Sequence, residues 1–334
     1  MPVELDSIER AAVQKYDLAW PEVDEDGYTL LTAGLSTFAD SVDDDTWGAN
    51  QHMQRLLSSG EGEAMNALRE HWDRVRAQDL TPVAGAARAL AAAVSPLTTV
   101  IAELKASVVA AAARMAADDT AALTAAAAAP GAPAAAAARN AILAQRANAR
   151  YGSVVENLLT SLRSVLADPA VIALENVPDD LAGGAGGRGG STGARWSEVF
   201  GGAGSGAEKG FGGSVGGGAA GGMPPGRAIG GVLRVDHEEH ELAAGRIREI
   251  GLKVRGETTA ELNAAVGDHG SVKSSGSFAI DLAQSVDLVL DRLSTATTAI
   301  GGHLSGALPD AILQVSNSQQ DTDEGNRQRM AQLD

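Results

Sequence analysis

The sequence contains no cysteine, and aromatic residues make up only 3% of its 334 positions. The absence of cysteine excludes disulfide bonds, thiolate metal sites and cysteine nucleophiles. It does not identify the compartment, because a secreted protein can do without disulfides. With so few aromatic side chains, the core must be built from alanine, leucine, valine and isoleucine. The length is sufficient for two domains.

Positive charge is also scarce. The chain has 26 lysines and arginines against 43 aspartates and glutamates, a formal net charge of −17. Contacts to nucleic-acid phosphates require clustered lysine and arginine side chains. We therefore expect no nucleic-acid partner. The same charge disfavours an anionic membrane surface, although it leaves other membrane contacts open.

Long apolar runs are missing as well. No stretch reaches the roughly 18–20 apolar residues of a membrane-spanning helix. The nearest is residues 83–117, which is interrupted by Arg88, Pro96, Glu103 and Lys105. The first twenty residues lack a basic region followed by an apolar one, so they do not form a Sec-type signal peptide.

Apolar residues instead recur every three or four positions, as in amphipathic helices. The pattern predicts helices over residues 5–19, 24–59, 62–78, 81–128 and 134–166, with a break at residues 130–133. The 24–59 segment has a heptad-like apolar seam, which favours side-by-side helix packing. Residues 1–182 are therefore predicted to form an elongated helical bundle.

The composition changes abruptly at residues 183–231, where glycine supplies nearly half of the positions. Such a segment cannot bury enough apolar area to offset its ordering entropy, which predicts a disordered linker. Helical periodicity resumes in residues 232–334, with helices up to residue 266 and from residue 277, and a loop over 267–276. The fold class is therefore all-α, with a carboxy-terminal helical hairpin.

This hairpin has one apolar stripe, which two helices alone cannot bury well. Its members are Leu242, Ile250, Val254, Leu282, Val286, Val289 and Leu293. A core of two helices is marginal for a chain of this size. We therefore expect the hairpin to dock by this face onto the helices of residues 1–166, in the same chain or in a neighbouring copy.

Motifs for catalysis or metal binding fail on their spacing. His237 and His240 lie three positions apart, whereas the zinc-protease signature needs histidines four apart. The glycine-rich segment follows no strand, and Lys209 comes after Glu208 rather than glycine, which excludes a phosphate-binding loop. We expect no enzymatic activity, no cofactor and no metal site.

The amino-terminal part resembles a known family. The stretches MPVEL, WPEVDEDGYTLLTAGLSTFADSV and GEGEAMNALREHWDRV are similar to the amino-terminal domain of actinobacterial type VII (ESX) secreted toxins of the channel-forming, CpnT type. The resemblance covers residues 1–120 and implies a Trp-x-Gly-like helical domain. It assigns the inter-helix turn to Gly62, Glu63 and Ala64 and the following aromatic to Trp72. Gly60 stands where the turn tryptophan is expected.

The carboxy-terminal part, from LRVDHEEHELAAGRIREI onward, resembles small EspC-type substrates of the same secretion system. Those proteins often end their second helix with a tyrosine and an acidic residue four positions later, which form the export signal. In this sequence Gln319 and Asp323 take those two places, so the signal is degenerate. Either a partner supplies the signal, or the protein is not exported by that route.

Together these features predict a non-catalytic, type VII secretion-associated protein that acts through protein–protein association, with two substrate-like modules fused in one chain. The resemblance implies secretion or placement in the cell envelope, with a cytoplasmic location as the other option. Its partners would be other type VII components or a cognate small helical protein, and self-association is open. The alternative is a pore-forming or envelope-active channel-type protein.

Overall fold

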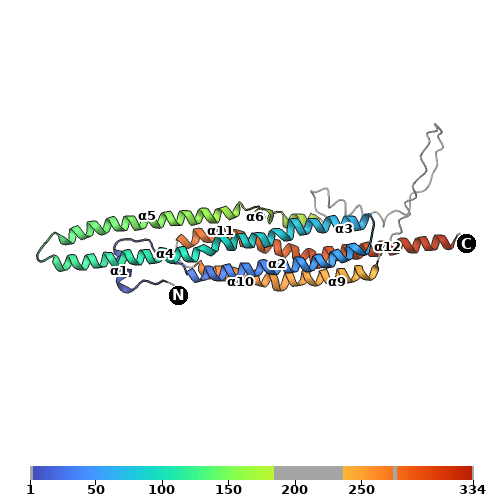
Figure 1. Cartoon of the computed structure of the whole chain (residues 1–334), viewed down its shortest axis with the longest axis horizontal. Helices are drawn as coiled ribbons and strands as arrows, with labels where there is room; N and C mark the ends of the chain where they lie inside the picture. Colours follow the sequence, from blue (N-terminus) through green and yellow to red (C-terminus); the bar gives the residue numbers. More distant parts are fainter. Residues whose placement is uncertain (1–2, 184–235, 274–276, 333–334) are drawn as a thin grey trace, which may run out of the picture. The chain divides into compact units, whose positions relative to one another are not determined.

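The structure is a computed structural model that describes residues 3–183, 236–273 and 277–332. It is all-α, as the sequence predicted, and these residues include no strand. The helices are α1 (Ser7–Lys15), α2 (Glu25–Ser59), α3 (Glu63–Arg74), α4 (Thr81–Ala125), α5 (Ala132–Leu166), α6 (Pro169–Ala173), α7 (Val177–Gly183), α9 (His237–Lys253), α10 (Thr259–Val272), α11 (Ser277–Gly302) and α12 (Leu308–Ala331) (Figure 1). Three π-helical turns join some of them: η1 (Val75–Leu80), η2 (Val254–Thr258) and η3 (His303–Ala307).

The chain forms two compact units. Unit 1 contains Met1–Asp44, Asp79–Asn176 and Val254–Thr298, and unit 2 contains Asp45–Gln78, Val177–Lys253 and Ala299–Asp334. These units do not coincide with the sequence-predicted modules 1–182 and 232–334, because each unit includes segments of both. The predicted linker, residues 183–231, lies outside the described residues apart from Gly183, the last residue of α7.

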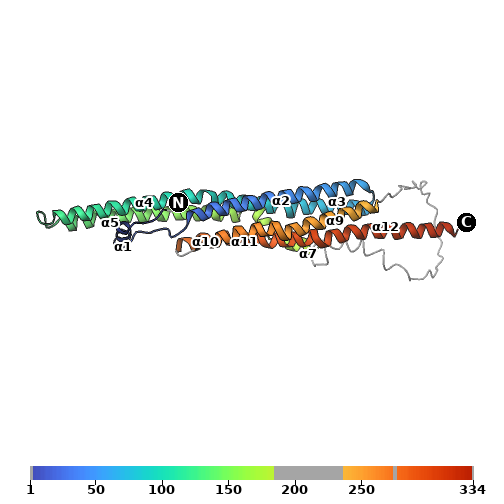
Figure 2. The same cartoon turned by 90° about the horizontal axis from the view of Figure 1, so that it is seen from below.

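In unit 1, α4 and α5 lie side by side in opposite directions, and the short α1 packs on them (Figures 1 and 2). Proline and glycine at residues 130–133 separate the two long helices, as the sequence predicted. The core between these three helices and the residues just after α1 is made of aliphatic side chains and one methionine, namely Ala12, Leu18, Val108, Ala112, Met115 and Ala144. A capping box of Asp6 and Glu9 begins α1, because each side chain accepts a hydrogen bond from the other residue's backbone nitrogen.

The first part of α2 contributes Leu31, Leu35 and Phe38 to the core of unit 1, all fully buried. These residues belong to the heptad-like seam that the sequence displays. In unit 2, α9 and α12 lie side by side, and η3 packs on both. The end of α2, together with α3 and α7, also belongs to this unit.

Helices continue at two places where the sequence predicted a break. The predicted helix start at Thr81 and Pro82 follows η1 directly, so the chain is helical from Glu63 to Ala125. The predicted loop over 267–276 is wrong up to residue 272, because α10 continues to Val272. Val272 is buried, and this burial outweighs the low helix propensity of Gly267 and Gly270.

No single helix among the described residues has both the length and the apolarity that a membrane span requires. One bent pair, Ala132–Leu166 with Pro169–Ala182, meets them together with a bend of 51°.

Candidate functional site

The turn that the resemblance singles out joins α2 to α3 in unit 2. Gly60 is buried, Glu63 is exposed and begins α3, and Ala64 is half-buried. Gly62 has φ 133° and ψ 177°, a conformation open to glycine and strained for other residues. Its carbonyl accepts the first hydrogen bond of α3, from the Asn66 nitrogen at 3.0 Å. Glycine at position 62 is therefore required by the backbone of the turn.

We expect Gly62→Ala to lower the free energy of unfolding by about 1–3 kcal/mol, the usual cost of this backbone region for a residue with a Cβ. The measurement is urea unfolding followed by circular dichroism. Gly152→Ala is the control, because Gly152 lies in α5, has open space around it and gains helix propensity on substitution. Equal stability of the Gly62→Ala variant and the wild type would contradict the assigned turn geometry.

Trp72 anchors α3 to α2. Its ring is fully buried, and its Nε1 donates a hydrogen bond to Asn50 Oδ1 at 3.0 Å. Arg69 donates a second bond from α3 to the Leu57 carbonyl near the end of α2, at 3.2 Å. The turn and the aromatic that the sequence analysis assigned thus belong to one helix–turn–helix corner. Asn50 carried no signal in the sequence, because a half-buried polar residue inside a helix has no pattern of its own.

The predicted docking face of the carboxy-terminal segment divides between the units. Val254, Leu282, Val286, Val289 and Leu293 are all buried in unit 1, each no more than 3% exposed. Unit 1 otherwise consists of residues from the amino-terminal half of the chain. These five side chains therefore lie in a core that both halves of the chain build.

The other two members of that face, both on α9, differ from the expectation. Leu242 is 43% exposed and Ile250 is half-buried. The buried residues of α9 are His240, Ala243, Ala244, Ile247 and Gly251. The inward face of this helix is thus rotated by about one residue from the predicted stripe. The stripe placed Leu242 inward, whereas the structure places Ala243 there.

Small residues on α2 allow the carboxy-terminal helices to approach it closely. A Cβ on Gly27 would lie 2.3 Å from Val272 Cγ2, and one on Gly34 would lie 3.0 Å from the Ala265 Cβ, both in unit 1. In unit 2, a Cβ on Gly48 would lie 3.5 Å from Ile250 Cδ1. Positions 27, 34 and 48 share one heptad register, which places them on the same face of α2. This spacing is visible in the sequence beside the apolar seam.

The helices α10 and α9 run antiparallel to α2. Residues further along α2 contact residues with lower numbers on α10 and α9. As the α2 position rises from 27 to 34, its contact in unit 1 moves back from Val272 to Ala265. In unit 2 the order is the same: Asp45 pairs with Lys253 at 2.7 Å, and Arg55 pairs with Glu239 at 2.7 Å. A helix of the amino-terminal half therefore pairs in register with the carboxy-terminal half within each unit.

A buried ion pair holds the start of α2 to α4 in unit 1. Lys105 Nζ lies 2.5 Å from Glu25 Oε2 and donates a second hydrogen bond to the Val23 carbonyl at 2.6 Å. Glu25 Oε1 accepts a bond from the Val3 nitrogen at 2.8 Å. Burial by itself would raise the pKa of Glu25, but the bonds from Lys105 and Val3 hold that pKa below its ordinary value.

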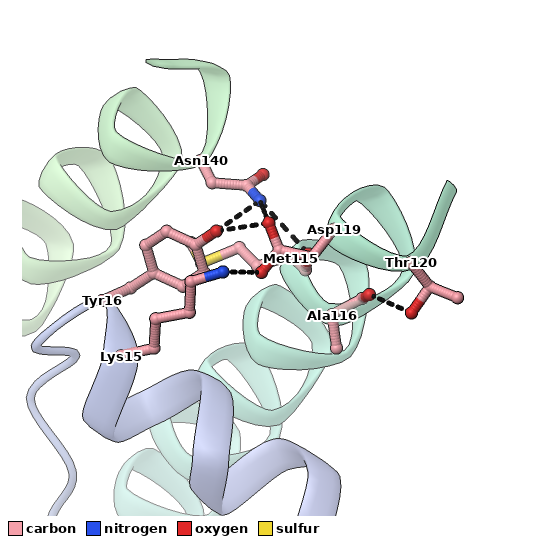
Figure 3. Close-up of polar contacts among 7 residues, drawn as sticks. All are labelled: Lys15, Tyr16, Met115, Ala116, Asp119, Thr120 and Asn140. Carbon is pink, nitrogen blue, oxygen red and sulfur yellow. Dashed lines mark hydrogen bonds and ion pairs between the residues drawn. The ribbon is translucent and has the colours of Figure 1, made fainter. Parts of the chain in front are cut away.

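A second polar cluster holds the end of α1 to α4 and α5 (Figure 3). Asp119 accepts hydrogen bonds from Lys15 at 2.5 Å and from the Tyr16 hydroxyl at 2.6 Å. Asn140, which is fully buried on α5, donates to the Met115 carbonyl at 3.1 Å and to Tyr16 Oη at 3.0 Å. Burial opposes the ionisation of Asp119, but the bonds from Lys15, Tyr16 and Asn140 keep the pKa of Asp119 below its ordinary value.

The histidines at the start of α9 make separate contacts. His237 Nδ1 lies 2.7 Å from Ser316 Oγ, and His240 Nδ1 lies 2.9 Å from the Asp236 carbonyl. No group of three potential metal ligands occurs among the residues that the structure describes. The positions of the degenerate export signal, Gln319 and Asp323, both lie in α12, and Gln319 is half-buried.

No family model, curated protein or solved structure matches this chain. The resemblance to type VII secretion substrates therefore rests on the sequence stretches quoted above. The site itself consists of helix-to-helix contacts: a glycine turn, a buried tryptophan, a row of glycines, a buried ion pair and a partly buried polar cluster. Such an arrangement positions helices against one another.

Proposed function

We propose that this chain is a non-catalytic helical protein associated with type VII secretion, in which two substrate-like modules fused in one polypeptide act as a pre-assembled pair. Its work is association with other components of that system or with a cognate small helical protein. The observation that carries the proposal is the pairing of α2 with the carboxy-terminal helices through its row of glycines. Small substrates of the resembled families associate as pairs of helical hairpins, and a fusion would keep such a pair together.

The interleaving of the two halves supports this interpretation. Unit 1 combines residues 1–44 and 79–176 with residues 254–298, and unit 2 combines residues 45–78 with residues 237–253 and α12. Each half supplies the apolar surface that the other half needs to bury. Both halves belong to one polypeptide, so their pairing is intramolecular, which favours the paired state.

A cleavage experiment tests the fused pair. A site-specific protease sequence is placed between residues 205 and 206 of the full chain, and the purified protein is then cut. We expect the two fragments to elute together in size-exclusion chromatography, because the pairing is non-covalent and extensive. Fragments that separate and stay helical as independent monomers would refute the fused pair.

A secretion experiment tests the pathway. The tagged full chain is produced in a host with a type VII system and in the same host without the ATPase of that system. We expect the protein in the medium or the envelope fraction only when the ATPase is present. Export that is independent of the ATPase, or retention in both strains, would contradict the secretion assignment.

The pore-forming alternative has one observation in its favour, the bent pair of α5 with residues 169–182. Leakage of dye from liposomes distinguishes the two functions. The proposed function predicts no leakage above the level of a helical control protein, whereas a channel-type protein would release the dye at low protein-to-lipid ratios.

A further inference from the structure

Two histidines far apart in the chain meet in the interior of unit 2. His71 lies on α3 and His303 is the first residue of η3, 232 positions away. Their Nε2 atoms are 3.0 Å apart, and the rings are inclined by 56° with centroids 5.1 Å apart. Both side chains are buried. This contact joins α3 to the π-helical turn that precedes α12.

The distance between the two nitrogens limits the number of protons that the pair can hold. One proton between them makes an ordinary N–H···N hydrogen bond, in which one neutral ring donates and the other accepts. If both rings are protonated, two N–H groups and two positive charges face each other at this distance. That state is repulsive, and burial removes the water that would screen it.

One cation of unit 2 adds to this effect. Arg74 on α3 is itself a cation, and its charge further disfavours protonation of His71. The cations of α9 pair with carboxylates: Arg246 with Glu249 at 2.9 Å, Arg248 with Asp310 of α12 at 2.9 Å, and Lys253 with Asp45 of α2 at 2.7 Å.

We propose that the His71–His303 pair makes the contact between α3 and η3 sensitive to acid, so that η3 separates from α3 when the solution becomes mildly acidic. The contact is closed near neutral pH, when the two rings share one proton. At mildly acidic pH both rings bind an additional proton once the contact is open. Acid therefore shifts the equilibrium towards the open form, and unit 2 opens locally at this contact. The proposal does not depend on the secretion assignment.

The pKa values of the two histidines determine how the stability of the contact changes with pH. Burial lowers the pKa of His71 to about 3, with His303 and Arg74 adding to the effect, and burial lowers the pKa of His303 to about 4. Histidine in water has a pKa of about 6.5, so the open form binds more protons. The contact therefore has its full stability above about pH 6.5 and loses it as the pH falls through the interval towards 4. Two such histidines raise the opening constant by on the order of 10²-fold or more between pH 7 and pH 5.

The distribution of histidine concentrates the effect in one unit. Five of the six histidines belong to unit 2, namely His52, His71, His237, His240 and His303. Unit 1 has only His269, which lies 3.2 Å from Asp287. Burial lowers the pKa of His269, and the charge of Asp287 opposes that shift only in part. Mild acid should therefore act on unit 2 before unit 1.

Hydrogen–deuterium exchange with mass spectrometry tests the proposal on the full chain at pH 7 and pH 5, with EDTA present and intrinsic exchange rates corrected. We expect peptides from α3 and from η3 with the start of α12 to gain exchange at pH 5 by a factor of at least ten. Peptides from α4 and α5 of unit 1 should stay within a factor of two. Equal corrected exchange of the α3 and η3 peptides at both pH values would overturn the proposal.

Variants assign the effect to the pair. In His71→Gln/His303→Gln the two amides can bond to each other at any pH, so we expect most of the acid-induced exchange to disappear. His240→Gln removes another buried histidine of the same unit, and His52→Gln removes a half-buried one; both should keep the acid response. Loss of the response in His240→Gln, or its persistence in the double variant, would overturn the assignment to His71 and His303. The wild-type comparison stands by itself if the double variant fails to fold.

Discussion

Gly251→Ala is expected to lower the free energy of unfolding by about 3 kcal/mol or more, the upper range for overpacking a close contact. A Cβ on Gly251 would lie 2.3 Å from the Ser305 nitrogen and 2.5 Å from the Leu304 carbonyl carbon. Both are backbone atoms of η3, so no side-chain rotation relieves the clash. The helix would have to move away from η3, which would also break the Arg248 hydrogen bond to the Ser305 carbonyl.

The matched control is Gly245→Ala in the same helix. No atom lies within 4 Å of the position that its Cβ would occupy. Alanine in a helix interior is favoured over glycine by roughly 0.5–1 kcal/mol, so this variant should be slightly more stable than the wild type. Urea unfolding of the two variants measures the contrast. If both variants were equally stable, α9 and η3 would not approach as closely as the structure shows.

Lys105→Met is expected to lower the free energy of unfolding by about 3–5 kcal/mol, because it leaves the Glu25 carboxylate buried without its cation. The methionine fills much of the same space, so the loss reports the ion pair more than a cavity. The Val23 carbonyl also loses its donor. Urea unfolding at pH 7, followed by circular dichroism, gives the magnitude.

The double variant Glu25→Gln/Lys105→Met separates charge from packing. Removing both charges should recover a large part of the stability, because replacing a buried pair is often near neutral whereas breaking it is costly. The ion pair should also make the stability of the wild type depend on pH. The folded-state pKa of Glu25 is lowered, so its contribution to stability is present above the ordinary glutamate pKa and is lost as the pH falls through the folded-state value. A double variant no more stable than Lys105→Met would show that the ion pair is not the cause.

These two positions act in different units and through different physics. Gly251 lies in unit 2 and Lys105 in unit 1, and the first effect is steric whereas the second is electrostatic. Acid sensitivity should likewise differ, since most of the histidines are in unit 2. Comparing the Gly251→Ala and Lys105→Met variants by hydrogen exchange would show whether each substitution destabilises its own unit or the whole chain.

The periodicity of the sequence determined the helices and much of their buried faces. Leu31, Leu35 and Phe38 recur at helical spacing and are fully buried, because a helix with one apolar stripe must cover that stripe. The acidic composition and the missing cysteines restricted the classes of partner and chemistry. Gly62 and Trp72 were singled out through the family resemblance, since a glycine turn followed by an aromatic is a local feature that a short motif can carry.

Only the tertiary structure decided what covers each face. Gly27 and Gly34 are helix-weakening residues by local propensity, yet in unit 1 they let α10 approach α2 closely. Residues 267–272 were predicted to be a loop because they contain helix-weakening glycines. They are helical because Val272 is buried. Leu242 points outward although its periodicity placed it inward, since alanine suits the closer helix contact. The His71–His303 contact joins positions 232 apart, and no local pattern encodes a partner at that separation. Local propensity acts over a few residues, whereas close approach, burial and proton sharing depend on which distant segments meet.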